Sequence, residues 1–344
     1  MSIFISIISA AISGVLNGSF AVPMKRTVKW EWENVWLVYA ATAMIVLPLI
    51  ITLYTVPQLL SVYRDTPRDV LVLTFLFGVG WGLGSVTFGL GLHMAGLSLG
   101  YTILIGVIAV TGSLIPMLVH NRGSLLQPGG MIIILAMAVT IAGAALCGTA
   151  GAIREKEQQK NRLQQGKSDG FKWAFLVCVA SGILSAMINI AFDFGAPIAQ
   201  TARTYLAEQS SAFKANNPVW LLILYGGFIP NFLYCAYLMV RKGSWKKYGE
   251  RGTGIYWLWG VLMGTIWMGC IVFYGIGASG LGKLGTTVGW LILMAVTMLV
   301  GNLWGVITGE WRQASEKAKQ RMVQGFLLLV GSVMLVGLGR FLLG

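Results

Sequence analysis

Apolar runs of about 20 residues recur along almost the whole chain and are separated by short polar segments. Ten such runs lie at about 2–22, 35–55, 70–92, 97–119, 130–150, 172–193, 218–240, 254–277, 284–308 and 323–342. A helix of about 20 residues crosses the hydrocarbon core of a bilayer, whereas membrane-spanning strands need alternating segments of about 10 residues, which the sequence lacks. The pattern therefore predicts an all-α integral membrane protein with ten transmembrane helices.

The composition supports a surface that faces lipid. Of 344 residues, 56% are hydrophobic and only 11% are charged, whereas a soluble protein carries roughly 25% charged residues. The net charge of +13 lies in the short segments between the runs and forms no basic stripe. This distribution indicates membrane orientation and gives no support for nucleic-acid binding.

The basic residues are distributed unequally between the two sets of loops. The segments after runs 1, 3, 5, 7 and 9 hold 18 of the 25 Lys and Arg residues. The positive-inside rule therefore predicts that these segments are cytoplasmic and that both termini lie outside, in the periplasm of a bacterial cell with an inner membrane. The first run precedes its basic residues Lys25, Arg26 and Lys29, so we expect a retained helix and no cleaved signal peptide.

A polar linker at 152–170 divides the chain into two halves of five runs each, 1–151 and 171–344. Short motifs recur between the halves: Ser13-Gly14-Val15-Leu16 returns as Ser181-Gly182-Ile183-Leu184, Gly78 and Trp81 return as Gly264 and Trp267, and Gly112-Ser113-Leu114 returns as Gly301-Asn302-Leu303. An odd number of spans inverts the second copy in the membrane. The sequence thus predicts a 5+5 inverted repeat, an architecture typical of secondary transporters that bind substrate near the midplane and expose it alternately to either side.

Several stretches carry a more specific resemblance. They are Phe20–Arg26, Phe77–Gly84, Gly264–Trp267 and Glu310-Trp311. In these stretches the chain resembles the L-rhamnose–proton symporter family of the drug/metabolite transporter superfamily. The resemblance implies import of a neutral deoxy-sugar, with L-rhamnose as the first expectation, by proton symport. The segment Met268-Gly269-Cys270 departs from the more polar stretch of that family, which leaves the sugar open. The sequence also leaves open whether the coupling ion is a proton or sodium.

A sugar site needs hydrogen-bonding side chains and aromatic faces in a largely apolar pocket. The polar residues that we expect to line it are Asn17, Ser85, Thr87, Asn189 and Asn302, and the aromatic ones are Trp81, Trp267, Tyr274 and Trp290. Tryptophan also occurs in the interfacial belt of membrane proteins, and buried asparagine also holds helices together. Both alternatives stay open for these residues.

Proton coupling needs a side chain that changes its charge, and such side chains are scarce in this chain. No Asp or Glu falls in the middle third of any predicted span. The candidates are Asp193, near the outer end of the sixth run and one turn after Asn189, then Glu310 and His93 at the inner ends of helices. The alternative for Asp193 is a solvated charge at the outer membrane surface.

Two other classes of function compete with sugar import. One is a drug/metabolite-type exporter or a facilitator for another small neutral carbohydrate or metabolite. The other is a membrane enzyme or scaffold, but the sequence shows no nucleophile–base pair and no metal-ligand cluster. We therefore expect no enzyme activity, no cofactor, no metal and no nucleic-acid partner. The expected partners are the sugar, protons and the lipid bilayer, in a monomer or weak homo-oligomer.

Overall fold

All regular elements in the described part of the chain are helices. The computed structural model describes residues 2–95, 97–159, 171–207 and 212–343. Its elements, in chain order, are α1 Ile3–Ser19, η1 Val22–Arg26, α2 Trp32–Ala41, η2 Thr42–Val46, α3 Leu47–Thr55, α4 Leu59–Asp65, α5 Arg68–Ala95, α6 Leu97–His120, η3 Arg122–Ser124, α7 Pro128–Gln159, α8 Phe171–Phe194, α9 Ala196–Thr204, α10 Ala212–Lys242, η4 Ser244–Gly249, α11 Gly254–Gly280, η5 Gly282–Leu284, α12 Gly285–Ile307 and α13 Glu316–Leu342.

Ten helical segments of this part of the chain are long and apolar enough to cross a membrane. They are Ile3–Arg26, Trp32–Thr55, Arg68–Leu92, Gly100–His120, Pro128–Glu157, Lys172–Thr204, Phe213–Lys242, Gly254–Gly280, Gly282–Ile307 and Glu316–Leu342. Each contains most of one predicted run, so the prediction of ten transmembrane helices is confirmed. Large apolar side chains such as Phe4, Val240 and Leu327 are 71%, 79% and 68% exposed, as expected for surfaces that face lipid.

Two spans are interrupted rather than straight. The second consists of α2 and α3 joined by a π turn at Thr42–Val46, a local widening of the helix that is frequent at functional sites. The sixth continues beyond Gly195 into the short helix α9, whose Pro197 stands in the first turn, where proline costs no hydrogen bond. Helix α7 extends to Gln159, past the start predicted for the polar linker, and residues 160–170 lie outside the described part.

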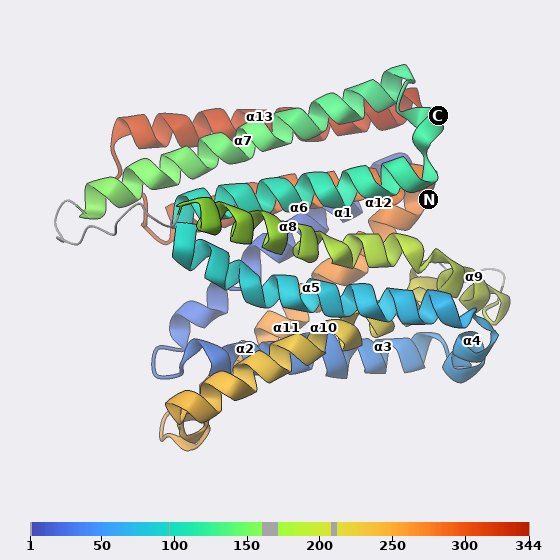
Figure 1. Ribbon diagram of the computed structural model, residues 1–344, viewed down its shortest axis with the longest axis horizontal. Coiled ribbons are helices and arrows are strands. Elements are labelled where there is room, and N and C mark those ends of the chain that lie inside the picture. Colours follow the sequence, from blue (N-terminus) through green and yellow to red (C-terminus); the bar gives the residue numbers. More distant parts are fainter. Residues whose placement is uncertain (1, 96, 160–170, 208–211, 344) are drawn as a thin grey trace.

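The helices pack in a pattern that treats the two halves alike (Figure 1). Helix α1 packs between α11 and α12, and helix α8 packs between α5 and α6. The fifth and tenth spans, α7 and α13, lie side by side along one edge of the bundle. The first span of each half thus contacts the third and fourth spans of the other half.

Glycine makes these contacts close at matched positions. A Cβ atom added to Gly14 would come within 2.6 Å of Val296, and one added to Gly182 would come within 2.7 Å of Val107. Small residues allow helices to approach where lipid provides no hydrophobic driving force. The inverted relation of the two halves, with boundaries at 1–151 and 171–344, stays a prediction that these matched contacts support.

The bundle has two distinct ends. Both termini lie at one of them (Figure 1), which we call the terminal end. The opposite end carries the segments after α1, α10 and α12, with Lys25 and Lys247 among their basic residues. We call it the basic end.

Candidate functional site

A cavity of about 690 Å³ extends from the middle of the bundle toward the basic end. This volume lies within the range of about 300–1,000 Å³ that is usual for small-molecule sites. Its walls come from α1, α2, α5, α6, α8, α10, α11 and α12, so both halves of the chain contribute. Aromatic and aliphatic side chains dominate the lining.

Trp81 of α5 and Trp267 of α11 face each other across the two halves. Their rings stack with centroids 5.5 Å apart and planes 9° from parallel. Both side chains line the cavity and are nearly buried, at 7% and 6% exposure. The repeated motif thus places two equivalent tryptophans side by side in the cavity wall, where aromatic rings suit the apolar part of a sugar.

The deep end of the cavity is closed by an aromatic wall. Tyr274 is fully buried and lies between Trp220 and Trp290, with ring centroids 6.0 Å and 5.7 Å away. The Trp290 indole Nε1 donates a hydrogen bond to the carbonyl of Ile108 over 3.0 Å, which fixes the ring. Phe192 stacks on Trp220 with ring centroids 4.3 Å apart and also contacts Tyr274 at 5.8 Å. The wall separates the cavity from the terminal end.

Asn231 of α10 organises the polar groups nearer the basic end. Its Oδ1 accepts a hydrogen bond from the Trp36 indole Nε1 at 2.8 Å and lies 3.0 Å from the Ser85 hydroxyl. Its Nδ2 donates to the carbonyl of Gly227 at 2.9 Å. Ser85 and Trp36 line the cavity. This amide therefore orients two residues that a substrate would touch.

Further polar groups in the lining differ in whether they already have partners. The Asn17 Nδ2 donates to Thr297 Oγ1 at 3.1 Å, which joins α1 to α12 inside the cavity. The Ser185 hydroxyl and the Trp220 indole N–H are buried and have no hydrogen-bond partner among the described residues. Buried polar groups are normally satisfied. Both residues line the cavity, but these two atoms are covered by protein: Ser185 Oγ lies against Gly84, and Trp220 Nε1 lies against Gly275.

The structure brings six of the nine expected substrate-site residues to the cavity. They are Asn17, Trp81, Ser85, Trp267, Tyr274 and Trp290. Asn189 lies one layer behind the wall, where its Oδ1 accepts the Tyr274 hydroxyl and its Nδ2 donates to the carbonyls of Gly112 at 2.7 Å and Thr286 at 3.0 Å.

Thr87 and Asn302 lie outside the lining. The Thr87 hydroxyl donates to the carbonyl of Leu83 at 2.9 Å, and the Asn302 amide donates to that of Met298 at 2.9 Å. Each is a bond back to the preceding turn of its own helix. Such bonds satisfy a polar side chain that faces away from a polar site.

Sequence reasoning missed several cavity residues. Trp32 and Trp36 begin a helix, a position that suggests the interfacial belt, yet both line the cavity. Tyr39 and Trp220 also line it, and neither belongs to a repeated motif. The repeat was the available signal, and it points only to residues that have an equivalent in the other half.

The cavity is open at the basic end. Trp32, Leu90 and Tyr234 line it there and are 38%, 49% and 38% exposed, whereas Tyr274 and Trp220 at the deep end are 0% and 2% exposed. A molecule therefore reaches the aromatic wall from the basic end and is blocked from the terminal end.

Asp193 lies beyond the wall, near the terminal end. Its Oδ1 accepts a hydrogen bond from Thr286 Oγ1 at 2.7 Å, and its Oδ2 lies 3.1 Å from His120 Nε2. The carboxylate is 14% exposed and the imidazole 47%. The sequence alone did not single out His120, which ends the fourth apolar run 73 positions before Asp193 and approaches it only through tertiary packing.

The two other expected proton-site residues have different surroundings. Glu310 lies at the basic end, 2.7 Å from Lys25 Nζ and 3.2 Å from Arg154 Nη1. Partial burial acts to raise the pKa of Glu310, but the Lys25 hydrogen bond and the charges of Lys25 and Arg154 outweigh burial and hold it below its usual value. The side chain of His93 lies outside the described part of the chain.

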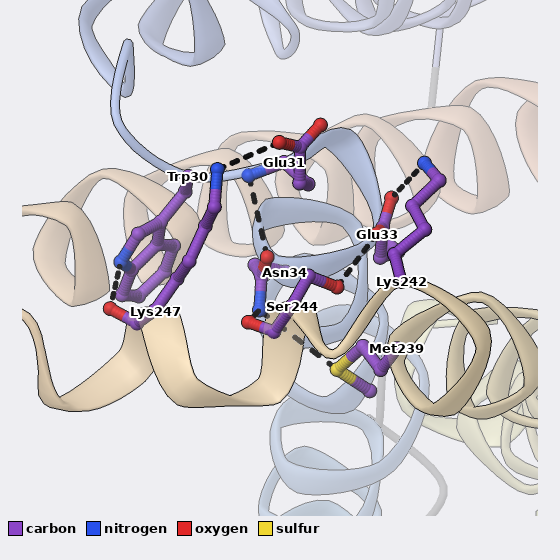
Figure 2. A network of polar contacts seen from close by, with 8 residues as sticks. All are labelled: Trp30, Glu31, Glu33, Asn34, Met239, Lys242, Ser244 and Lys247. Carbon is purple, nitrogen blue, oxygen red and sulfur yellow. Dashed lines mark hydrogen bonds and ion pairs between the residues drawn. The ribbon is translucent and has the colours of Figure 1, made fainter.

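The basic end also holds a network that joins α2 to α10 and η4 (Figure 2). The Glu33 carboxylate is completely buried, where it accepts hydrogen bonds from Ser244 Oγ at 2.7 Å and Lys242 Nζ at 3.1 Å. Lys247 Nζ lies 2.6 Å from Glu31. The Asn34 amide donates to the carbonyl of Ser244 at 3.0 Å. These contacts fasten one half of the chain to the other beside the cavity mouth.

Comparison with known proteins identifies the family. The family of the L-rhamnose-proton symport protein (RhaT) matches residues 1–341, nearly the whole chain. The chain belongs to this family. Two similar relatives are the L-rhamnose-proton symporters of Yersinia pestis (strain Pestoides F) and Yersinia pseudotuberculosis serotype O:3 (strain YPIII). Each is 26% identical over 355 residues, which cover 98% of either protein.

The family membership and the ten spans confirm a multi-pass membrane transport protein and not an enzyme. A protein of known crystal structure aligns with 96% of this chain and 95% of its own length, at a TM-score of 0.55 and 14% identity. That likeness concerns the fold alone. The resemblance seen in the stretches from Phe20 to Trp311 is thus confirmed at the level of the RhaT family.

Proposed function

We propose that this protein imports a neutral deoxy-sugar, with L-rhamnose as the first candidate, by proton symport across a bacterial inner membrane. The observation that carries the proposal is the lining of the cavity. No Asp, Glu, Lys, Arg or His side chain lines it among the described residues. A buried cavity without charge disfavours an ionic substrate, because the desolvated charge would have no partner. The relatives named as L-rhamnose-proton symporters support the same substrate class and do not favour export.

The chemistry of the walls suits a deoxy-sugar. The stacked Trp81 and Trp267 offer an apolar face to the ring and its methyl group. The Asn17 amide and the Ser85 hydroxyl offer donors and acceptors for sugar hydroxyls. Thr87 and Asn302, which bond to their own helices, are left out of the proposed site.

The open basic end is proposed to face the cytoplasm, with both termini in the periplasm, on the ground of the positive-inside rule. The structure then corresponds to the inward-facing state of an alternating-access cycle. The outward-facing state would arise by exchanging the conformations of the two halves, as in other inverted-repeat transporters. The matched contacts of Gly14 and Gly182 support equivalent roles for the two halves.

Among the three expected proton sites, Asp193 is the one that we retain. It is nearly buried and lies one turn beyond Asn189, which holds the Tyr274 hydroxyl of the cavity wall. Glu310 is half-exposed and lies between two cations, which stabilise its ionised form and oppose a cycle of protonation.

The test is uptake of labelled L-rhamnose by proteoliposomes that contain the purified protein, with the external medium buffered lightly and its pH recorded. We expect accumulation driven by an inward proton gradient, alkalinisation of the medium on sugar addition, and competition by unlabelled deoxy-hexoses. A tenfold excess of a sugar phosphate should not compete, because its charge has no partner in the cavity. Absence of both accumulation and alkalinisation would overturn the proposal, and uptake that ignores the gradient would indicate a facilitator.

A further inference from the structure

Asp193 is connected to the sugar cavity through a short series of hydrogen bonds. Thr286 donates to Asp193 Oδ1 at 2.7 Å, and the carbonyl of the same Thr286 accepts the Asn189 Nδ2 at 3.0 Å. The Oδ1 of Asn189 in turn accepts the hydroxyl of Tyr274, which lines the cavity. One amide side chain therefore contacts both the cavity wall and the residue that holds the carboxylate.

His120 connects the same carboxylate to the terminal end. Its Nε2 lies 3.1 Å from Asp193 Oδ2, and its side chain is 47% exposed. Its ring also packs edge-on against Phe194, with centroids 5.4 Å apart. Imidazole is the side chain that changes charge near neutral pH, so this residue is suited to exchange protons with the medium.

The direct contacts of Asp193 are His120 and Thr286. Among the described residues, the titratable groups that act on Asp193 are His120 from α6 and Tyr274 from α11. The neighbouring elements α5 and α10 present Phe77 and Trp220 to the same turn of α8, and α12 presents Thr286. His120 is therefore the basic side chain in direct contact with the carboxylate, and the charged residues Arg122 and Lys283 lie beside His120 on the segments joined by the Asn121–Lys283 hydrogen bond.

The pair has a counterpart at the basic end. Gly14 contacts Val296, and Gly182 makes the matched contact with Val107. Corresponding positions in the first spans of the two halves are therefore 168 residues apart, as Gly14 and Gly182 are. Those in the fourth spans are 189 residues apart, as Val107 and Val296 are. The same spacings relate Lys25 to Asp193, and relate His120 to the position next to Glu310. The Lys25–Glu310 ion pair is thus the repeat-related equivalent of the Asp193–His120 pair.

We propose that Asp193 and His120 together hold the transported proton, and that Asn189 and Tyr274 couple its presence to sugar in the cavity. The inference rests on the proposed symport. At both ends an ion pair ties the end of the first span of one half to the end of the fourth span of the other. The basic-end pair is a lysine and a carboxylate, which stay charged at neutral pH, whereas the terminal-end pair contains an imidazole. Near neutral pH, a proton can therefore break the contact between the helices only at the terminal end.

The proton step balances without any other reactant. An imidazolium formed at His120 by a proton from the medium transfers that proton to Asp193 Oδ2. This yields a neutral imidazole and a neutral carboxylic acid, and the ion pair that holds α6 to α8 is lost. When the carboxylic acid later releases its proton to the other side, the carboxylate returns.

The test uses proteoliposomes and two modes of labelled L-rhamnose transport. Gradient-driven uptake requires net proton movement, whereas equilibrium counterflow at one pH does not. We expect Asp193→Asn to lower gradient-driven uptake at least tenfold while counterflow stays within twofold and no longer depends on pH. His120→Gln keeps a polar group but removes the positive charge, so the midpoint of the pH profile should move toward higher pH. Asp65→Asn is the matched control, because Asp65 is an acid of the terminal end that bonds Arg64 and Tyr205 away from the cavity; it should change neither mode.

Three results would decide against the inference. Concentrative uptake by Asp193→Asn with the wild-type pH profile would move the proton site elsewhere. An unchanged pH profile in His120→Gln, a substitution at a half-exposed position, would remove His120 from the proposal. Loss of both modes in Asp193→Asn without recovery in Asp193→Glu would assign the carboxylate a structural role. Absence of both modes in the wild-type protein would instead overturn the proposed function itself.

Discussion

The two ends of the bundle hold their helices together with different chemistry. At the basic end, Lys25–Glu310, Lys242–Glu33 and Lys247–Glu31 join separate elements through lysine and carboxylate groups. At the terminal end, the acid–base contact between separate elements among the described residues is His120–Asp193, with 3.1 Å between Nε2 and Oδ2.

The difference concerns how each end responds to protons. Lysine and carboxylate groups have ordinary pKa values far from 7, so their pairs are insensitive to pH near neutrality. A histidine–carboxylate pair changes its charge in that range. In a symporter that takes its proton from the terminal end, the contacts at that end must respond to protons. The contacts at the basic end need no response to protons; they only have to form and break as the carrier changes between its two states.

Among the substitutions at the basic end, removal of the buried Glu33 carboxylate should cause the largest loss of stability. Glu33→Ala removes a completely buried acceptor from Ser244 and Lys242 (Figure 2). The expected loss is about 2–3 kcal/mol of stability, as for hydrogen bonds to a charged group, seen as a lower thermal denaturation midpoint in detergent. Glu31→Gln is the control, since its pair with Lys247 is partly exposed and is worth less than about 1 kcal/mol. Equal effects of the two substitutions would show that burial does not distinguish the pairs.

The matched helix contacts predict equal effects in the two halves. Gly14→Ala and Gly182→Ala each place a methyl group less than 3 Å from a valine, Val296 or Val107, and each should cost about 1–3 kcal/mol through overpacking. Gly106→Ala is the control, because its added Cβ meets nothing within 4 Å. Thermal midpoints of the three variants give the comparison. A large effect of one glycine and none of the other would contradict equivalent roles for the halves.

The tryptophan stack lies between the two ends and should govern affinity. Trp81→Ala or Trp267→Ala removes one partner of the stacked pair, and we expect half-saturation for L-rhamnose to rise on the order of tenfold. The measurement is equilibrium binding or counterflow as a function of sugar concentration. Trp245→Ala is the control, because that ring is 58% exposed and lies outside the cavity lining. Unchanged affinity in both stack variants would remove the stack from the sugar site.

The smallest expected effect concerns the Lys25–Glu310 pair. Because the pKa of Glu310 is held below its usual 4.5, the pair contributes stability above that value and loses it only as the pH falls through the lowered pKa. Both side chains are about half exposed, so the contribution is less than about 1 kcal/mol. The thermal midpoints of the wild type and of Glu310→Gln should differ by a constant amount from pH 7 to about pH 5 and converge in stronger acid. A difference that changes between pH 6 and 7 would contradict the proposed insensitivity of the basic end.

The fold could be predicted from the sequence because the apolar runs that define the spans are a local feature of the chain. Apolar runs of about 20 residues determine the spans whatever their neighbours are, and all ten were predicted. The repeat singled out Trp81 and Trp267, which the structure stacks on each other in the cavity lining; their role in a sugar site stays a prediction. The π turn at Thr42–Val46 and the extension of α7 to Gln159 were not predicted, since both depend on packing or on a helix that continues into water.

The remainder of the site could not be predicted because it depends on contacts between distant positions. Asn231 carries no motif, and its role follows only from the approach of Trp36 and Ser85. His120 stands at the end of a run, where a histidine ordinarily faces solvent, and its importance follows from Asp193 being 3.1 Å away. Thr87 seemed suitable by residue type, but its hydroxyl bonds the carbonyl of Leu83 and it lies outside the cavity lining, although its neighbours Val86 and Phe88 belong to that lining.

Sugar-induced proton uptake, recorded as external alkalinisation, tests most directly whether Asp193 carries the proton. Proteoliposomes with Asp193→Asn and with Glu310→Gln are prepared side by side. L-rhamnose counterflow shows that the carrier in each preparation is intact. We expect alkalinisation to disappear in Asp193→Asn and to persist in Glu310→Gln, with counterflow retained in both. Alkalinisation that persists in Asp193→Asn and disappears in Glu310→Gln would place proton coupling at the basic end and contradict the account.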